Sequence, residues 1–241
     1  MATPLSPQVQ LVGVSAAKSS SEPRVNEDHL LMQGGPDMRF VVITDGASFG
    51  DPTVPAADLA YAVAQTCMAH LLRFSLQAAE QTEVLRAELI QSAQYRYNQI
   101  VRTIPQNKRL RSCTFVAVVA TPHQLVVIGS GNCFMYVRRS DGQLVNRRRF
   151  KNVIPGGSGF IVYRHECILH CLETVSVDHY DAAYFGSDGA YSRVFQRYRE
   201  DPGYANGIDR LERRQLEEHV TSTTLGPLED DTTFCRLRVP R

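Results

Sequence analysis

Two hydrophobic runs in this chain each end in the same Asp-Gly-Ala pattern. Residues 40–43 (Phe-Val-Val-Ile) lead into Thr44 and then Asp45-Gly46-Ala47, and residues 182–185 (Ala-Ala-Tyr-Phe) lead through Gly186-Ser187 into Asp188-Gly189-Ala190. A short, continuously apolar run is typical of a strand that is buried on both faces, and a glycine after it lets the backbone turn sharply. The pattern therefore predicts two buried strands that each deliver an aspartate at the C-terminal end.

The order of the remaining patterns predicts an α+β chain with mostly antiparallel strands. Strands are expected at residues 8–14, 28–32, 38–44, 115–120, 125–128, 135–138, 143–146, 161–163, 167–172, 182–185 and 232–239. Between them, apolar residues recur every four positions from Leu59 to Leu71 after Pro55, and from Leu85 to Val101. These two segments are expected to form helices that each pack one face on a sheet, and a polar surface helix is expected at residues 209–220.

Length and charge limit the class of protein. The 241 residues suit one domain spanning 1–241, and no linker divides them. The net charge of +1 argues against binding of nucleic acid through bulk charge. No apolar run approaches the roughly 18 residues that a membrane crossing requires, and the N-terminus has no secretion-signal pattern. The six cysteines therefore indicate reduced thiols and a cytoplasmic location, and we expect a monomer that binds neither membrane nor nucleic acid.

Two acidic pairs, Glu27-Asp28 and Asp230-Asp231, flank predicted strands in addition to the two Asp-Gly pairs. Carboxylates at the ends of adjacent buried strands repel one another strongly unless something offsets their charge. Hard divalent cations such as Mg²⁺ and Mn²⁺ prefer oxygen ligands and would do so. Asp-Gly is also a common turn dipeptide, so the pattern alone leaves a metal site and a pair of simple turns as alternatives.

Five segments in order along nearly the whole chain resemble the motifs of a known family. They are Arg24-Val25-Asn26-Glu27-Asp28, the strand ending in Asp45-Gly46, Ser112-Cys113-Thr114 with the strand after it, Tyr184-Phe185-Gly186-Ser187-Asp188-Gly189, and Asp230-Asp231-Thr232-Thr233. The chain thus resembles the metal-dependent protein phosphatases of the 2C type, the PPM family of Ser/Thr phosphatases. The resemblance implies a four-layer α-β-β-α sandwich of two mainly antiparallel sheets flanked by helices.

The resemblance also implies a centre of two manganese or magnesium ions at one end of the sandwich. A water shared by two cations loses its proton near neutral pH and can attack phosphorus, so the implied activity is hydrolysis of phosphoserine and phosphothreonine in proteins. Asp45 would bridge both ions, and Asp45, Asp188 and Arg24 would be the catalytic residues. The implied metal ligands are five carboxylates and one backbone carbonyl: Glu27, Asp28, Asp45, Gly46, Asp188 and Asp230.

Three positions depart from the family pattern. Asn132 stands where relatives have an aspartate that helps to bind a third ion, so that ion lacks its usual ligand here. Residues 47–50 replace a segment that commonly carries a histidine, which removes a general acid. Arg24 lies one residue closer to Asp28 than the phosphate-binding arginine of relatives, and either a phosphate ligand or a solvated loop arginine fits this position.

The sequence leaves two classes of function open. One is an active phosphatase whose partner is a phosphorylated protein, with a Ser/Thr kinase or its clients as further partners. The other is a pseudophosphatase that binds phosphoproteins as a regulatory module, which Asn132 and the segment after Gly46 favour. The Asp230-Asp231 pair also fits a phosphatase whose clients are anti-sigma-factor antagonists.

Two other clusters have simpler interpretations. Cys167 and Cys171 with His165 and His170 suit no common zinc motif, and buried thiols are the favoured interpretation. A basic hairpin around Asp141-Gly142 either keeps an edge strand soluble, which is the commoner case, or docks an acidic partner. Its basic residues are Arg138, Arg139, Arg147, Arg148, Arg149 and Lys151.

Overall fold

The computed structural model describes most of the chain. The described residues are 8–19, 25–35, 37–46, 56–73, 113–147, 162–163, 166–167, 173–195, 207–222 and 228–240, with single positions at 84, 87, 88, 91, 95, 99, 197 and 225. Among them, none of the helices combines the length and the apolar composition that a membrane crossing requires.

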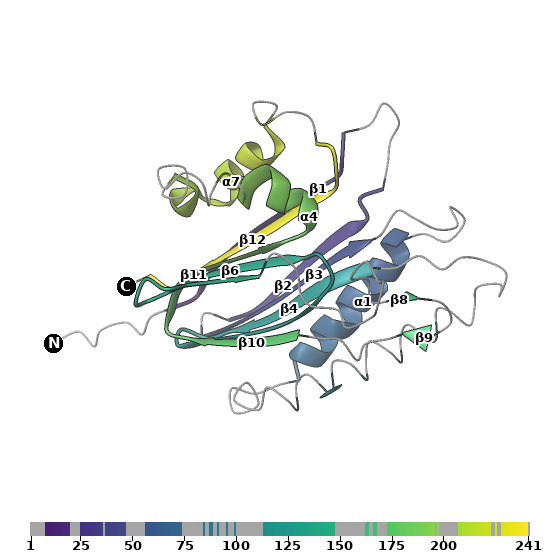
Figure 1. Cartoon of the computed structure of the whole chain (residues 1–241), viewed down its shortest axis with the longest axis horizontal. Coiled ribbons are helices and arrows are strands. Elements are labelled where there is room, and N and C mark those ends of the chain that lie inside the picture. Colours follow the sequence, from purple (N-terminus) through teal and green to yellow (C-terminus); the bar gives the residue numbers. More distant parts are fainter. Residues whose placement is uncertain are drawn as a thin grey trace.

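Two five-stranded antiparallel sheets form the centre of the molecule (Figure 1). The first contains, in order, β1 (Gln10–Ala16), β12 (Thr232–Arg238), β11 (Tyr180–Gly186), β6 (Phe134–Arg139) and β7 (Leu144–Arg147). The second contains β10 (Glu173–Asp178), β5 (Gln124–Ser130), β4 (Cys113–Ala120), β3 (Met38–Gly46) and β2 (Asp28–Gly35). We call them the β1–β7 sheet and the β10–β2 sheet. A short hairpin pairs β8 (Val162–Tyr163) with β9 (Glu166–Cys167).

Helices cover the outer face of each sheet. α1 (Ala56–Leu71) packs on the β10–β2 sheet through Val63, Cys67 and Leu71, the stripe that the sequence predicts. On the β1–β7 sheet lie α4 (Asp188–Ala190), the π-helical turn η2 (Tyr191–Phe195) and α7 (Arg213–Thr221), as Figure 1 shows. The layers are therefore helix, sheet, sheet and helix, which confirms the predicted α+β sandwich.

The apolar run at residues 40–43 shows why the strands are buried on both faces. Phe40 and Val42 contact α1, whereas Val41 and Ile43 lie in the core between the two sheets. Neighbouring side chains in a strand point to opposite faces, so Asp45 shares the inner face with Val41 and Ile43. This alternation directs Asp45 toward the other sheet at the end of the sandwich.

Several predicted elements differ from those observed. The strand β10 begins at Glu173 and was not predicted, because the apolar pattern favoured residues 167–172 instead. The predicted helix at 209–220 is interrupted: residues 207–210 form a separate helical turn, and α7 begins at Arg213 after the N-cap Glu212. A capping box explains this start, since the Glu212 N–H donates to the Gln215 side chain at 3.0 Å.

Parts of the sequence-based analysis lie outside the described residues. Of the second predicted helix only single positions are described; those between 84 and 99 are helical and exposed. Arg24, residues 47–50, Ser112, Cys171, His165 and His170 are not described.

In the basic hairpin, β7 is an edge strand, and Arg138 and Arg139 pair with carboxylates of the same chain, Asp209 at 3.0 Å and Asp141 at 3.5 Å.

Candidate metal and active site

The β10–β2 sheet places two carboxylates side by side. Asp45 lies directly opposite Asp28 in the β2–β3 ladder and opposite Thr114 in the β3–β4 ladder. Directly opposed residues of an antiparallel pair have Cβ atoms about 5 Å apart. Leu30 and Met32 of β2 pack into the core between the sheets, so Asp28 shares the inner face with Asp45. Asp28 is buried, with 3% of its surface exposed.

The β1–β7 sheet brings two more carboxylates to the same end. Asp188 follows β11 and opens α4, while Asp230 lies just before β12, the strand that pairs with β11. The Ser187 N–H donates to the Thr233 carbonyl at 3.0 Å, and the Ser187 hydroxyl accepts the Thr233 N–H at 3.0 Å. These two bonds hold the end of β11 against the start of β12, and so hold Asp188 near Asp230.

Neither glycine beside the aspartates has a positive φ, and Gly189 is required by close packing, which corrects the sharp-turn explanation at that position. Among the described residues, the glycines with positive φ are Gly34, Gly131 and Gly142, so neither Gly46 nor Gly189 is one of them. A Cβ atom at Gly189 would lie 2.2 Å from the Asp231 carbonyl oxygen. Glycine is therefore required at position 189 because the first turn of α4 lies directly against the segment that carries Asp230 and Asp231.

Asp28 has no hydrogen-bond partner for either carboxylate oxygen among the described residues, although both atoms are buried. Burial raises the pKa of Asp28 from 3.8 to about 7, and the charges of Asp231 and Asp230 add to this rise. The hydroxyls of Ser187 and Thr233 act in the opposite direction without reaching hydrogen-bond geometry. A buried carboxylate without a partner is costly, and no described residue forms a hydrogen bond that would offset the charge of an ionised Asp28.

Neighbouring carboxylates perturb one another across the two sheets. Burial raises the pKa of Asp45 well above its usual value, and the charges of Asp28, Asp188 and Asp230 raise it further. The pKa of Asp230 is also raised, first by burial and then by Asp188. The structure therefore brings together the four aspartates that the sequence nominates as metal ligands, from strands far apart in the chain.

Glu27 and Gly46, the other two nominated ligands, lie next to this cluster. The Gly46 N–H donates to the Glu27 carbonyl oxygen at 3.1 Å, which joins the start of β2 to the end of β3. Arg24, the nominated phosphate ligand, lies outside the described residues.

Asn132 contacts the cluster directly. Its side-chain N–H donates to an oxygen of Asp188 at 2.6 Å, while its own carbonyl oxygen is buried and has no partner among the described residues. A neutral amide therefore occupies the place beside Asp188. Behind the cluster, Cys133 contacts the Thr114 hydroxyl at 3.3 Å, and burial raises the pKa of this thiol well above its usual value.

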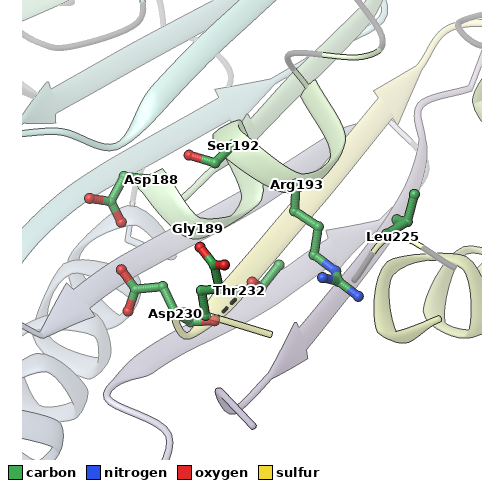
Figure 2. A pocket seen from close by; sticks show the side chains of 8 residues that line it. Asp188, Gly189, Ser192, Arg193, Leu225, Asp230 and Thr232 are labelled. Atoms are coloured by element: carbon green, nitrogen blue, oxygen red, sulfur yellow. Dashed lines mark hydrogen bonds between the residues drawn. The ribbon is translucent and has the colours of Figure 1, made fainter. Parts of the chain in front are cut away.

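A pocket of about 460 Å³ opens beside Asp188 and Asp230. In Figure 2 the two carboxylates point toward the same space, while the Arg193 side chain extends away from them toward Leu225. The Arg193 guanidinium donates to the carbonyls of Val220 and Ser222, at 2.6 and 2.7 Å. The remaining lining residues are Gly189, Ser192, Glu229 and Thr232. Sequence analysis did not identify Ser192 or Arg193, because neither belongs to an acidic pair or a strand end.

The donor set fits a hard divalent cation. Carboxylate and backbone carbonyl oxygens are the ligands that Mg²⁺ and Mn²⁺ prefer, and the Asp28 oxygens, which lack a hydrogen-bond partner among the described residues, are available to such a cation. In the described part of the chain no group of three or more His, Cys, Asp or Glu side chains already has the arrangement of a metal site. Binding of a cation would therefore require reorientation of these side chains toward a common point.

Comparison with known proteins shows the fold. No family model matches the chain, and no curated protein sequence matches it. Solved structures do: a serine/threonine phosphatase of S. agalactiae has a TM-score of 0.70 at 9% identity, covering 96% of this chain and 100% of the other. The catalytic domain of the phosphatase PstP, in complex with two manganese ions, has a TM-score of 0.65 at 14% identity over 98% and 100%. RsbX in complex with magnesium has a TM-score of 0.62 at 13% identity over 97% and 96%. The resemblance to type 2C phosphatases is thus confirmed at the level of the fold.

Proposed function

We propose that this chain, which has the fold of the type 2C phosphatases, is a metal-dependent protein serine/threonine phosphatase. One observation carries the proposal: Asp28 is buried opposite Asp45, neither of its oxygens has a hydrogen-bond partner among the described residues, and Asp188 and Asp230 arrive from the other sheet. Such a concentration of negative charge is typical of a site that binds divalent cations. Similar folds that contain manganese or magnesium support the same interpretation.

The proposed ligands of two Mn²⁺ or Mg²⁺ ions are Glu27, Asp28, Asp45, Asp188, Asp230 and the Gly46 carbonyl. Bound ions supply an activated water and offset the charge of the phosphoryl group. The chain's own contribution is to hold the carboxylates in place: Asp45 through the β2–β3–β4 ladders and Asp188 through the Asn132 amide. Arg24 is the proposed phosphate ligand, and the pocket beside Asp188 offers room for the phosphorylated side chain.

The substrate proposed for this site is a phosphorylated protein, with a Ser/Thr kinase or its clients as partners. The single domain spanning 1–241, the monomeric state and the cytoplasmic location stay predictions from the sequence. Among the described residues, Cys67, Cys133 and Cys235 are buried and form no disulfide, which is consistent with the reduced state on which the predicted location depends.

The test is hydrolysis of an aryl phosphate by the purified chain with and without Mn²⁺. We expect activity that requires Mn²⁺, stops with a chelator, and falls about a thousandfold or more in Asp45→Asn, because both the cations and their activated water depend on this carboxylate. Asp178→Asn is the matched control, since Asp178 is exposed and pairs with Gln124 on β5. Manganese-dependent activity that survives Asp45→Asn would refute the assignment of the site.

Isothermal titration with Mn²⁺ separates this function from the pseudophosphatase. An active phosphatase should bind two ions per chain, and Asp45→Asn should abolish this binding. Binding of no ion or one ion, together with tight binding of a phosphopeptide and no turnover, would favour the regulatory module. The hydrogen bond from Asn132 to Asp188 supports the pseudophosphatase alternative, because it places a neutral amide next to the carboxylate cluster.

A further inference from the structure

Asp231 is a buried carboxylate that the proposed mechanism does not use. Only 4% of its surface is exposed, and it follows Asp230 directly in the sequence. One of its oxygens accepts the backbone N–H of Lys18 at 2.8 Å, and the other accepts the backbone N–H of Glu27 at 2.7 Å. Both oxygens are therefore engaged, in contrast to those of Asp28.

The two amides lie on opposite sides of one connection. Residues 17–27 join β1 to β2, so Lys18 lies on the side of β1 and Glu27 on the side of β2. Asp231 binds both sides of this connection to the start of β12. On the β1 side, Ser19 also binds the segment before β12. The Ser19 N–H donates to the Leu228 carbonyl at 2.8 Å, and the Leu228 N–H donates to the Ser19 hydroxyl at 3.2 Å. Arg24 belongs to the same connection.

The backbone of Glu27 is held from both sheets. Its N–H donates to Asp231 beside β12, and its carbonyl oxygen accepts the N–H of Gly46 at the end of β3. The next N–H, that of Asp28, donates to the Asn26 side chain at 2.9 Å. The segment that presents Glu27 and Asp28 therefore has its position fixed relative to Asp45 and Asp230 by hydrogen bonds on each side.

This geometry requires a carboxylate. An ionised aspartate accepts hydrogen bonds at both oxygens, whereas an asparagine offers one acceptor oxygen and one N–H₂ group that only donates. Asparagine at position 231 would therefore place its N–H₂ group against the N–H of Lys18 or Glu27.

We propose that Asp231 is a positioning residue for the metal centre: its carboxylate joins Lys18 and Glu27 to β12, and thereby holds Glu27 and Asp28 in register with Asp45 and Asp230. The assignment of Glu27 and Asp28 as ligands rests on the proposed function, whereas the two hydrogen bonds of Asp231 do not. Loss of a group that orients metal ligands typically lowers metal affinity 10- to 100-fold.

The test compares Asp231→Asn with Asp209→Asn. Asp209 is equally suitable for an isosteric change, because it is buried and both its oxygens accept hydrogen bonds, but it lies on the outer face of the β1–β7 sheet. Two quantities are measured: hydrogen exchange of the Lys18 and Glu27 amides in the metal-free protein, and Mn²⁺ affinity by calorimetry. We expect Asp231→Asn to increase exchange at both amides at least tenfold and to lower Mn²⁺ affinity about 10- to 100-fold. Asp209→Asn should lower thermal stability and change neither quantity.

The outcomes are separable. Unchanged exchange at Glu27 in Asp231→Asn, or rapid exchange of this amide in the wild-type chain, overturns the proposed contact. Increased exchange with unchanged Mn²⁺ affinity overturns the positioning role. A wild-type chain that binds no Mn²⁺ while both amides are protected overturns the proposed function and with it the metal-positioning role, but leaves the contact itself established.

Discussion

Asp28 and Asp209 are both buried aspartates, with 3% and 7% of their surface exposed, but their surroundings differ completely. Asp209 accepts a hydrogen bond from Arg138 at 3.0 Å and another from the Tyr184 hydroxyl, so each oxygen has a donor. Asp28 has no partner for either oxygen among the described residues, and its nearest charged neighbours are also acidic.

The difference separates a structural charge from a functional one. A buried carboxylate that is paired and hydrogen-bonded can help to hold a fold together, because its desolvation is offset within the chain. At Asp209 the pairing joins β6 and β11 to the helical turn at residues 207–210. At Asp28 no described residue offsets this cost through a hydrogen bond, which is the reason for proposing a positively charged ligand there.

Among the substitutions, the largest effect on stability is expected at the paired aspartate. Asp209→Asn should lower the free energy of unfolding by about 2–3 kcal/mol, because it removes the charge on which the buried ion pair with Arg138 depends and turns an N–H₂ group toward a donor. Urea denaturation measures this loss. Mn²⁺ affinity should stay at the wild-type value, and a change in affinity would show that the two regions are coupled.

Asp28→Asn should raise the free energy of unfolding of the metal-free protein, whereas Asp209→Asn should lower it. At pH 8 the substitution removes an unpartnered buried charge, so we expect a gain of about 1–2 kcal/mol in the free energy of unfolding. The same variant should lose Mn²⁺ binding, which calorimetry detects. A metal-free variant less stable than wild type at pH 8 would mean that Asp28 is paired in solution.

Because the pKa of Asp28 is raised, the stability of the metal-free protein should depend on pH. Between its ordinary pKa of 3.8 and its folded value of about 7, the folded chain binds more protons than the unfolded chain. Stability of the metal-free protein therefore falls as the pH rises through this window, by an amount on the order of a few kcal/mol. Added Mn²⁺ should reverse the fall at pH 7–8, because it binds the ionised carboxylates. Thermal melts from pH 4 to 8, with and without Mn²⁺, measure both effects, and Asp28→Asn should flatten the metal-free profile.

The smallest effect is expected at Asn132. Asn132→Asp replaces a hydrogen bond to Asp188 with a repulsive charge, so the metal-free protein should lose about 1 kcal/mol. With Mn²⁺ present, the new carboxylate should bind an additional ion and raise turnover of an aryl phosphate. An unchanged number of bound ions and an unchanged rate would show that Asn132 does not limit this site.

Much of the fold follows from local patterns in the sequence. The continuous run at residues 40–43 and the four-residue periodicity of α1 each reflect burial on particular faces, and spacing in the sequence determines which side chains share a face. The strand β10 (Glu173–Asp178) was missed because the more apolar segment at residues 167–172 directly precedes it in the sequence. The start of α7 depends on one capping contact, between Glu212 and Gln215, which a periodic pattern does not reveal.

The sequence by itself determined which residue types end the strands, and hence that acidic groups would gather at one end of a sandwich. Only the tertiary structure decided which partners each of them contacts. Asp28 lies opposite Asp45, Asp188 accepts a hydrogen bond from Asn132, and Asp231 accepts hydrogen bonds from two backbone amides. The physical reason is distance along the chain. Asp231 and Glu27 are 204 positions apart, and strand register and close packing, rather than local pattern, bring such residues within hydrogen-bond distance.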